Sequence, residues 1–146
     1  MAEVLQLVFE PLPDADLERF IEDNVIAVNI AQTGVAEWHP FGYFLRNGLG
    51  EWLGGCIGMV WGGWVNVRWL WVAQALRGQG NGARLLDAAE RFGVSHGATG
   101  ATLETHSAQA LGFYQKRGYK VFGTLEDFPP GHAKSYLRKN LSRTRR

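Results

Sequence analysis

The residues best suited to chemistry form a glycine-rich loop between an apolar run and a stretch with helical spacing. The loop reads Arg77, Gly78, Gln79, Gly80, Asn81 and Gly82. The first N–H groups of a helix have no partner within it, and the helix dipole is positive at that end. Glycines let a ligand approach such a backbone closely, and phosphate is the usual guest. The loop therefore predicts a site for a phosphate-bearing ligand.

Two well-known phosphate-binding motifs fit this loop poorly. A Walker loop needs Lys-Ser or Lys-Thr after its final glycine, and Ala83-Arg84 stands there instead. A dinucleotide fingerprint needs the spacing G-x-G-x-x-G, whereas these glycines are spaced G-x-G-x-G. Glu104 does lie near the place of a ribose-binding acid, which leaves the dinucleotide alternative open. That motif, however, belongs to an early βαβ unit, and here hairpin signals precede it.

A third phosphate-binding pattern fits. The loop resembles motif A of the GNAT superfamily of acyl-CoA-dependent N-acyltransferases, [Arg/Gln]-x-x-Gly-x-[Gly/Ala], and follows a strand ending in Leu70-Trp71-Val72. Residues 113–119, Phe-Tyr-Gln-Lys-Arg-Gly-Tyr, look like the family's aromatic-Tyr-x-x-x-Gly-aromatic motif. The resemblance covers residues 51–124 firmly and implies acetyl-CoA as co-substrate.

The resemblance implies a cofactor site made largely of backbone. The amides of residues 78–82 would hold the CoA pyrophosphate, with Arg77 opening the motif. Backbone groups near Leu70 and Val72 would pair with the pantetheine and polarise the acyl carbonyl. Ser107 stands where the family often has an asparagine that touches the cofactor, and its shorter side chain weakens that contact.

Tyr114 resembles the tyrosine that protonates the leaving CoA thiolate. A phenol with a pKa near ~10 can donate to a thiolate whose conjugate acid has a pKa near ~8.5. An aromatic residue in a helix is also commonly a core residue, so packing is the competing interpretation.

The general base is not fixed by any pattern. Family members commonly place a glutamate on the strand before motif A, but here that strand offers Asn66 and Arg68, which are poor bases. Glu104, His106 and His132 are the substitutes, and each also fits a surface or capping role. A water chain without a single base is an equal alternative.

Charge and aromatic residues point to a cationic acceptor. Residues 1–37 hold eight acidic side chains and one basic one, a net charge of −7. The whole chain has a net charge of +1, so the remaining residues carry a net charge of +8. Acidic surfaces concentrate cations. The resemblance places the acceptor cleft beside the first helix and the loop after it. Trp38 and His39 in that loop and His132 in a late loop are therefore the candidate substrate contacts.

The spacing of apolar and turn residues predicts one mixed α/β domain over residues 1–146. Asn47 to Gly50 and Gly62-Gly63 are turn signals, so the strands around them must be antiparallel. A strand–helix–strand crossover follows, and then a last helix and two strands. The expected strands are 4–9, 41–46, 51–60, 65–72, 101–105, 119–124 and 134–141, and the expected helices are 14–33, 83–96 and 108–117. The resemblance implies a GNAT-type central mixed sheet of six to seven strands, whose parallel pair splays to admit the cofactor.

Composition excludes several classes of protein. With 46% hydrophobic and 20% charged residues, the 146-residue chain is globular, neither disordered nor fibrous. Its single cysteine, Cys56, allows no internal disulfide and indicates a buried apolar residue in a cytoplasmic protein. The first 20 residues do not resemble a signal peptide, and residues 52–68 are too short and glycine-rich for a membrane helix. We expect no metal, no nucleic-acid partner and no membrane, and a homodimer is possible because dimers are common in such folds.

The function predicted from these features is an acetyl-CoA-dependent N-acetyltransferase. An amine of a small, cationic acceptor would attack the thioester directly, in a ternary complex with the enzyme. Two alternatives stay open. One is a non-catalytic acyl-CoA-binding or sensing protein, which the lack of a clear base favours. The other is an acetyltransferase of a protein or peptide amine.

Overall fold

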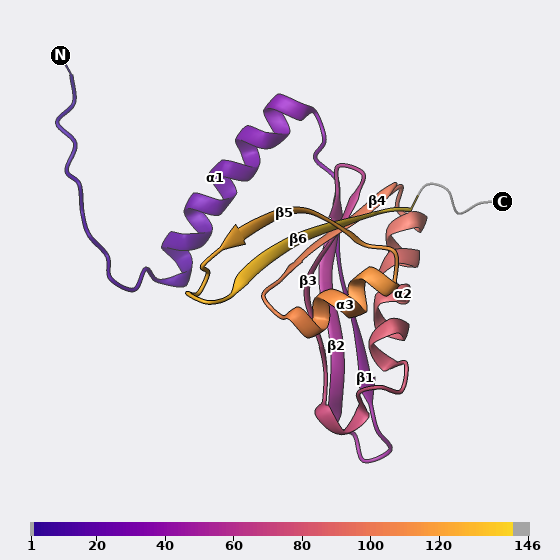
Figure 1. Cartoon of the computed structure of the whole chain (residues 1–146). Coiled ribbons are helices and arrows are strands. Elements are labelled where there is room, and N and C mark those ends of the chain that lie inside the picture. Colours follow the sequence, from indigo (N-terminus) through magenta and orange to yellow (C-terminus); the bar gives the residue numbers. More distant parts are fainter. Residues whose placement is uncertain (1, 142–146) are drawn as a thin grey trace. The chain divides into compact units, whose positions relative to one another are not determined.

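The computed structural model describes residues 2–141, which divide into two compact units between Ala36 and Glu37. The first unit contains helix α1 (Ala15–Thr33) (Figure 1). Asp14 caps this helix by accepting a hydrogen bond from the Leu17 N–H at 2.7 Å, and Gly34 ends it with a φ of 74°. These are the start and stop predicted from the sequence.

Two predictions for the N-terminal region were wrong. Residues 4–9 form no strand, because a strand needs a hydrogen-bonded neighbour and no described strand pairs with this segment. Its apolar side chains are exposed. Trp38, His39 and Pro40 do not lie in a loop. They begin strand β1, since each pairs with a residue of the next strand, Trp38 with Trp61 for example.

The second unit is built on a six-stranded sheet. Its elements, in chain order, are β1 (Trp38–Arg46), β2 (Trp52–Trp61), β3 (Trp64–Val72), the short 3₁₀ helix η1 (Gln74–Leu76), α2 (Asn81–Ser95), β4 (Gly100–Thr105), α3 (Ala108–Lys116), β5 (Lys120–Glu126) and β6 (Ala133–Asn140). The strand order is β1-β2-β3-β4-β6-β5. Every neighbouring pair is antiparallel except β3 and β4, which the α2 crossover makes parallel. The predicted mixed sheet is therefore confirmed, with six strands.

The parallel pair comes apart after three residues. β3 and β4 are paired only from Trp64–Gly100 to Asn66–Thr102. Beyond that point β3 stays paired with β2 while β4 stays paired with β6. The sheet therefore opens in its middle, as the resemblance implied, and the opening lies directly before the glycine-rich loop. We call this opening the notch.

A β-bulge changes the direction of the β3 side chains at the start of the notch. Ile57 of β2 pairs with Trp69 while Gly58 pairs with Val67, so Arg68 is one extra residue in β3. Before the bulge Val65 and Val67 are buried, and after it Val72 is buried instead.

One face of the sheet carries the core of this unit. Leu85, Leu86 and Ala89 of α2 and Tyr114 of α3 share one buried cluster with the strands. On the opposite face, Trp69 and Trp71 are 66% and 54% exposed. We call these the helix-covered face and the open face.

Candidate active site

The glycine-rich loop presents backbone amides. Gly80 is the N-cap of α2, with a φ of 86° and no side-chain cap. The first helical hydrogen bond runs from the Arg84 N–H to the Gly80 carbonyl at 3.0 Å, so the N–H groups before Arg84 have no helical acceptor. The side chains of Gln79 and Asn81 turn back and donate to the Ala75 and Leu76 carbonyls at 3.2 and 3.0 Å. The loop thus offers amides rather than side chains.

The glycines of the loop have two different structural roles. A Cβ added at Gly78 or Gly80 would meet no atom within 4 Å, so these residues border open space. A Cβ added at Gly82 would lie 3.3 Å from Cζ of Phe113 in α3. Gly82 therefore also allows α3 to pack closely against the start of α2.

Arg77 ties the loop to the end of β3. Its Nε donates a hydrogen bond to the Val72 carbonyl at 2.8 Å. The contact fixes the distance between strand and loop, and a phosphate contact by the same side chain stays a prediction.

The backbone of Leu70 and Val72 faces the notch. The Ala73 N–H points the other way, toward β2, where it donates to the Leu53 carbonyl at 2.8 Å. Because N–H groups alternate along a strand, those of Leu70 and Val72 point away from β2. On that side the ladder with β4 has already ended. These two amides can therefore pair with a ligand lying in the notch.

Tyr114 of α3 is a buried residue that carries a polar hydroxyl group. Its side chain is 7% exposed, and its hydroxyl forms no hydrogen bond with any residue in the range 2–141. Burial, with a smaller contribution from the Cys56 thiol, raises the pKa of Tyr114 from 10.0 to about 12. Tyr114 shares the core cluster with Val72 and with Cys56, which is the ladder partner of Leu70. Buried hydroxyls nearly always have a partner, so we expect this one to bond to a water molecule or to a ligand atom.

Glu104 lies on the open face. It alternates along β4 with Leu103, which is buried in the core, and its side chain is 51% exposed. Its Oε2 accepts from Nζ of Lys134 at 3.1 Å, and that ammonium also lies over the rings of Phe128 and Tyr136. The hydrogen bond to Glu104 is the main cause that raises the pKa of Lys134. The candidate base is therefore present near the notch but already paired.

The other predicted site residues are scattered. Ser107 caps α3 by accepting from the Ala110 N–H at 3.0 Å. His132 lies in the turn between β5 and β6, and His106 stacks with Phe128 from that turn. Trp38 and His39 lie on the edge strand β1, where the His39 ring contacts His96 at the far end of α2 from the loop. The structure therefore does not bring Trp38 and His39 to the notch.

A cavity that the sequence did not suggest starts at the loop. Its volume is about 460 Å³, and it runs along α2 toward the end of α3. Four basic side chains line it, Arg84, Lys116, Arg117 and Lys139, together with Gly80, Ala83, Leu86, Asp87 and Glu90. The basic residues around α2 and α3 were its only signal in the sequence.

Residues 2–141 contain neither a metal-binding cluster nor a membrane-spanning helix. In that range no three His, Cys, Asp or Glu side chains gather in a way that could hold a metal ion. No helix in the same range is long and apolar enough to cross a membrane.

Comparisons with known proteins agree with this geometry. Residues 35–121 match the family model described as an acetyltransferase (GNAT) domain. Acetyltransferase Atu2258 of Agrobacterium fabrum is 31% identical over 94% of this chain and all of its own length. Blasticidin-S acetyltransferase of Streptomyces morookaense is 42% identical over 63% of this chain and 68% of its own.

Solved structures show the same fold. A crystal structure of an acetyltransferase from Bacillus cereus ATCC 14579 is 26% identical, with a TM-score of 0.78, and the match covers 92% of this chain and 98% of that one. GNAT acetyltransferases use acetyl-CoA, and the open amides of the loop and the unpartnered Tyr114 hydroxyl fit that molecule. The chain belongs to the GNAT acetyltransferase family and is an acetyl-transferring enzyme.

Proposed function

We propose that this enzyme acetylates a primary amine of a small cationic acceptor, by direct attack of the amine on acetyl-CoA in a ternary complex. The observation that carries the proposal is the buried Tyr114 hydroxyl, which has no hydrogen-bond partner within residues 2–141 and belongs to the same core cluster as Val72. Leaving such a donor unpaired costs about 1–3 kcal/mol. A sulfur atom in the notch would offset that cost.

The backbone of the loop would hold the pyrophosphate of the cofactor. The amides of residues 78–82 surround the open start of α2, where the helix dipole favours an anion. From Gly80 the cavity continues past the basic side chains of Arg84, Lys116 and Arg117. Positive charges in this part of the cavity, beyond the loop, suit the remaining phosphate group of CoA.

Acetyl-CoA, when bound, supplies a thioester whose acetyl group passes to nitrogen as the C–S bond breaks. The amides of Leu70 and Val72 would donate hydrogen bonds along the notch, and one facing the thioester oxygen would stabilise charge developing there. Tyr114 would give its hydroxyl proton to the departing sulfur. Its raised pKa of about 12 keeps that proton in place at neutral pH.

The proton of the attacking amine would leave on the open face. Glu104 is the nearest carboxylate along β4, and a water chain ending there is an equivalent route. Acid and base would then act from opposite faces of the sheet, so that neither neutralises the other.

Several features support a small cationic acceptor. Trp69, Trp71 and Glu104 leave aromatic rings and a carboxylate on the open face, and both attract ammonium groups. Residues 1–37 add a net charge of −7 that attracts cations at longer range. One relative is named for acetylating a small molecule, blasticidin-S. We assign residues 1–146 to a single acetyltransferase domain, because the Agrobacterium fabrum relative matches 94% of the chain.

The test is the release of free CoA thiol from acetyl-CoA with a panel of matched amines. The panel contains a polyamine, an aminoglycoside, a lysine-like amine, a neutral and an anionic amino acid, and a basic peptide. We expect the highest kcat/KM for a small cationic amine, and a decrease at higher salt because exposed charges are screened. Preference for an anionic acceptor would contradict the proposal, and preference for the peptide would favour a protein-directed enzyme.

A further inference from the structure

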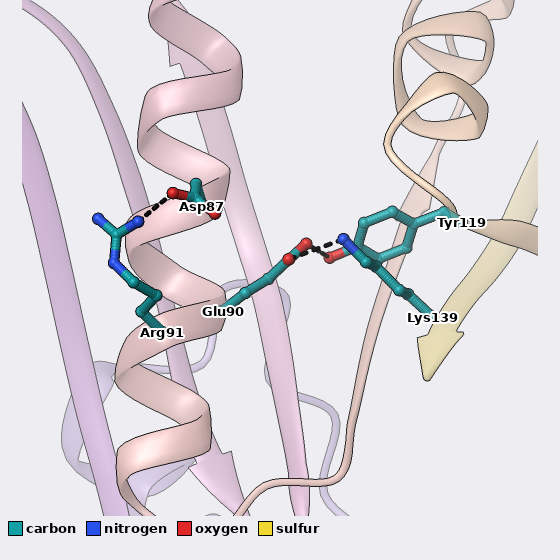
Figure 2. A network of polar contacts seen from close by, with 5 residues as sticks. All are labelled: Asp87, Glu90, Arg91, Tyr119 and Lys139. Carbon is teal, nitrogen blue, oxygen red and sulfur yellow. Dashed lines mark hydrogen bonds and ion pairs between the residues drawn. The ribbon is translucent and has the colours of Figure 1, made fainter. Parts of the chain in front are cut away.

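A buried polar network lies between α2, β6 and the residue after α3. Glu90 of α2 is 9% exposed, and it is the one buried charged residue within residues 2–141. Its Oε2 accepts from the Tyr119 hydroxyl at 2.7 Å and its Oε1 accepts from Nζ of Lys139 at 2.8 Å (Figure 2). Both carboxylate oxygens are therefore satisfied by the chain itself.

The stability of the fold does not by itself explain this network. Burying a carboxylate carries a desolvation cost, and its partners in the interior often only offset that cost. Well-packed apolar residues at such positions commonly give equal stability. The role of Glu90 therefore depends on the residues that its partners, Tyr119 and Lys139, contact.

Tyr119 connects the network to Tyr114. The two rings meet edge to face, with centroids 5.9 Å apart and planes at 65°. The Tyr119 N–H also donates to the Tyr114 carbonyl at 3.1 Å, while its hydroxyl is held by Glu90. Tyr119 is thus fixed at both ends and presses on the side of the Tyr114 ring.

The Tyr114 ring has no polar anchor of its own. Its hydroxyl bonds to no residue of the described chain, so packing within the core sets its direction, with Phe113 and Tyr119 as its aromatic neighbours. A rotation of Tyr119 would therefore be transmitted directly to the ring that carries the proton.

We propose that Glu90, acting through Tyr119, is a positioning residue that aims the Tyr114 hydroxyl into the notch. This role rests on the proposed function of Tyr114 as the proton donor. Lys139 compensates the charge of Glu90 and so keeps the carboxylate a strong acceptor for the Tyr119 hydroxyl. The network lies on the helix-covered face, where Glu90 and Lys139 line the cavity that begins at the glycine-rich loop.

The test is a double-mutant cycle between Tyr119 and Tyr114. Tyr119→Phe keeps the ring and leaves Glu90 paired with Lys139, so the variant is expected to fold. A small misplacement of a catalytic group can cost about 100-fold, and losing one of several restraints on Tyr114 should lower kcat about 10-fold. The KM for acetyl-CoA should not change. In a Tyr114→Phe background the same substitution should leave kcat unchanged, because no proton donor remains to be aimed.

Thermal midpoints and a control variant separate positioning from stability. Tyr119→Phe should lower the thermal midpoint equally in both backgrounds, since the lost hydrogen bond is the same. Arg91→Gln breaks the surface pair between Arg91 and Asp87 on the same helix, also drawn in Figure 2, and should leave kcat at the wild-type value. Glu90→Gln should repeat the effect of Tyr119→Phe on kcat.

Three results would overturn the proposal. One is a wild-type kcat for Tyr119→Phe, which would leave the function of Tyr114 untouched. Another is an equal fractional loss of kcat in both backgrounds, which would mean that the network only supports the fold. The third is a wild-type kcat for Tyr114→Phe itself, which would remove the proton donor from the proposed function as well.

Discussion

The helix-covered face and the open face of the notch are built in different ways. On the helix-covered face, Tyr114 is buried, its hydroxyl has no partner within residues 2–141, and Tyr119, which Glu90 holds, packs against its ring. On the open face, Glu104 is half exposed and already bound to Lys134. The helix-covered face therefore holds the Tyr114 hydroxyl rigidly and without a partner among the described residues. The open face holds the Glu104 carboxylate in an ion pair that solvent can reach.

This difference matches the two molecules that an acetyltransferase must bind. The cofactor is the same in every turnover, so a rigid site with preset donors stabilises the transition state without rearrangement. Acceptors vary among related enzymes, and exposed side chains can change without disturbing the core. Substitutions on the helix-covered face should therefore have large effects, and those on the open face small ones that depend on the acceptor.

The largest effect should come from filling the phosphate cradle. Gly80→Val places a branched side chain in the open space beside the loop amides, at a φ of 86°. We expect acetyl-CoA affinity to fall by at least about 100-fold, the scale of several lost charge-assisted hydrogen bonds. Titration calorimetry measures it.

Gly97→Val is the matched control for that variant. Gly97 also has a φ of 86° and open space around it, but lies just beyond the opposite end of α2. Both variants carry the same backbone strain, so only the steric block of the loop should separate their affinities. Equal affinities would remove the loop from the cofactor site.

The next largest effect should come from Tyr114→Phe. The substitution keeps the ring packing and removes only the proton donor. We expect kcat to fall roughly 10- to 1000-fold, the scale of lost general acid catalysis, with an unchanged KM for acetyl-CoA. Tyr43→Phe, at a half-buried tyrosine against Phe41 and Phe92, should leave kcat unchanged. If both variants turn over like the wild type, Tyr114 is a core residue.

The same two faces separate what the sequence could predict from what it could not. The loop, the strand before it and the tyrosine motif were predictable because their chemistry lies in local backbone shape and spacing. Glu90 was missed although it carried a signal, since it interrupts the apolar stripe of α2 between Leu86 and Gly93. Only the fold reveals that Tyr119 and Lys139 reach it from 29 and 49 residues away.

The open face was harder to predict for a physical reason. The pairing of Glu104 with Lys134 joins β4 to β6, two strands that are far apart in sequence, and no local pattern encodes it. The strand expected over residues 4–9 failed similarly, because β propensity does not supply a hydrogen-bonded neighbour. Trp38 and His39 were expected beside the acceptor cleft because they follow the first helix in the chain. Their register in β1 places them away from the notch.

Stability at alkaline pH should report the buried groups of the helix-covered face. Burial raises the pKa of Cys56 from 9.0 to about 11 and that of Tyr114 from 10.0 to about 12, and it also raises that of Tyr119. The unfolded chain releases these protons first, so the contribution of the three groups to the free energy of unfolding is constant below about pH 8.5 and then decreases. Each such proton contributes about 1.4 kcal/mol per pH unit.

Urea unfolding followed by tryptophan fluorescence between pH 8 and 11 measures this decrease. Tyr114→Phe removes one of the protons and should make it shallower. Arg91→Gln should hardly change it, because a guanidinium keeps its charge over this whole pH range. A flat profile up to pH 11 would show that the three groups titrate normally in the folded protein.

The smallest effects should come from the pair on the open face, and they should have opposite signs. Glu104→Gln removes a carboxylate that can attract the ammonium of the acceptor or take its proton, so kcat/KM for cationic amines should decrease. Lys134→Met frees that carboxylate from its internal partner, so the same ratio should increase. As changes to an ion pair, both effects should stay within about fivefold. A loss of about 100-fold or more for Glu104→Gln would instead identify Glu104 as the general base. Lys120→Met removes a similar exposed charge from β5 and should change neither rate. With a neutral acceptor the Lys134 effect should vanish if Glu104 binds a cation, and it should persist if Glu104 is the base. A decrease for Lys134→Met with every acceptor would instead mean that the lysine holds the β5–β6 turn in place.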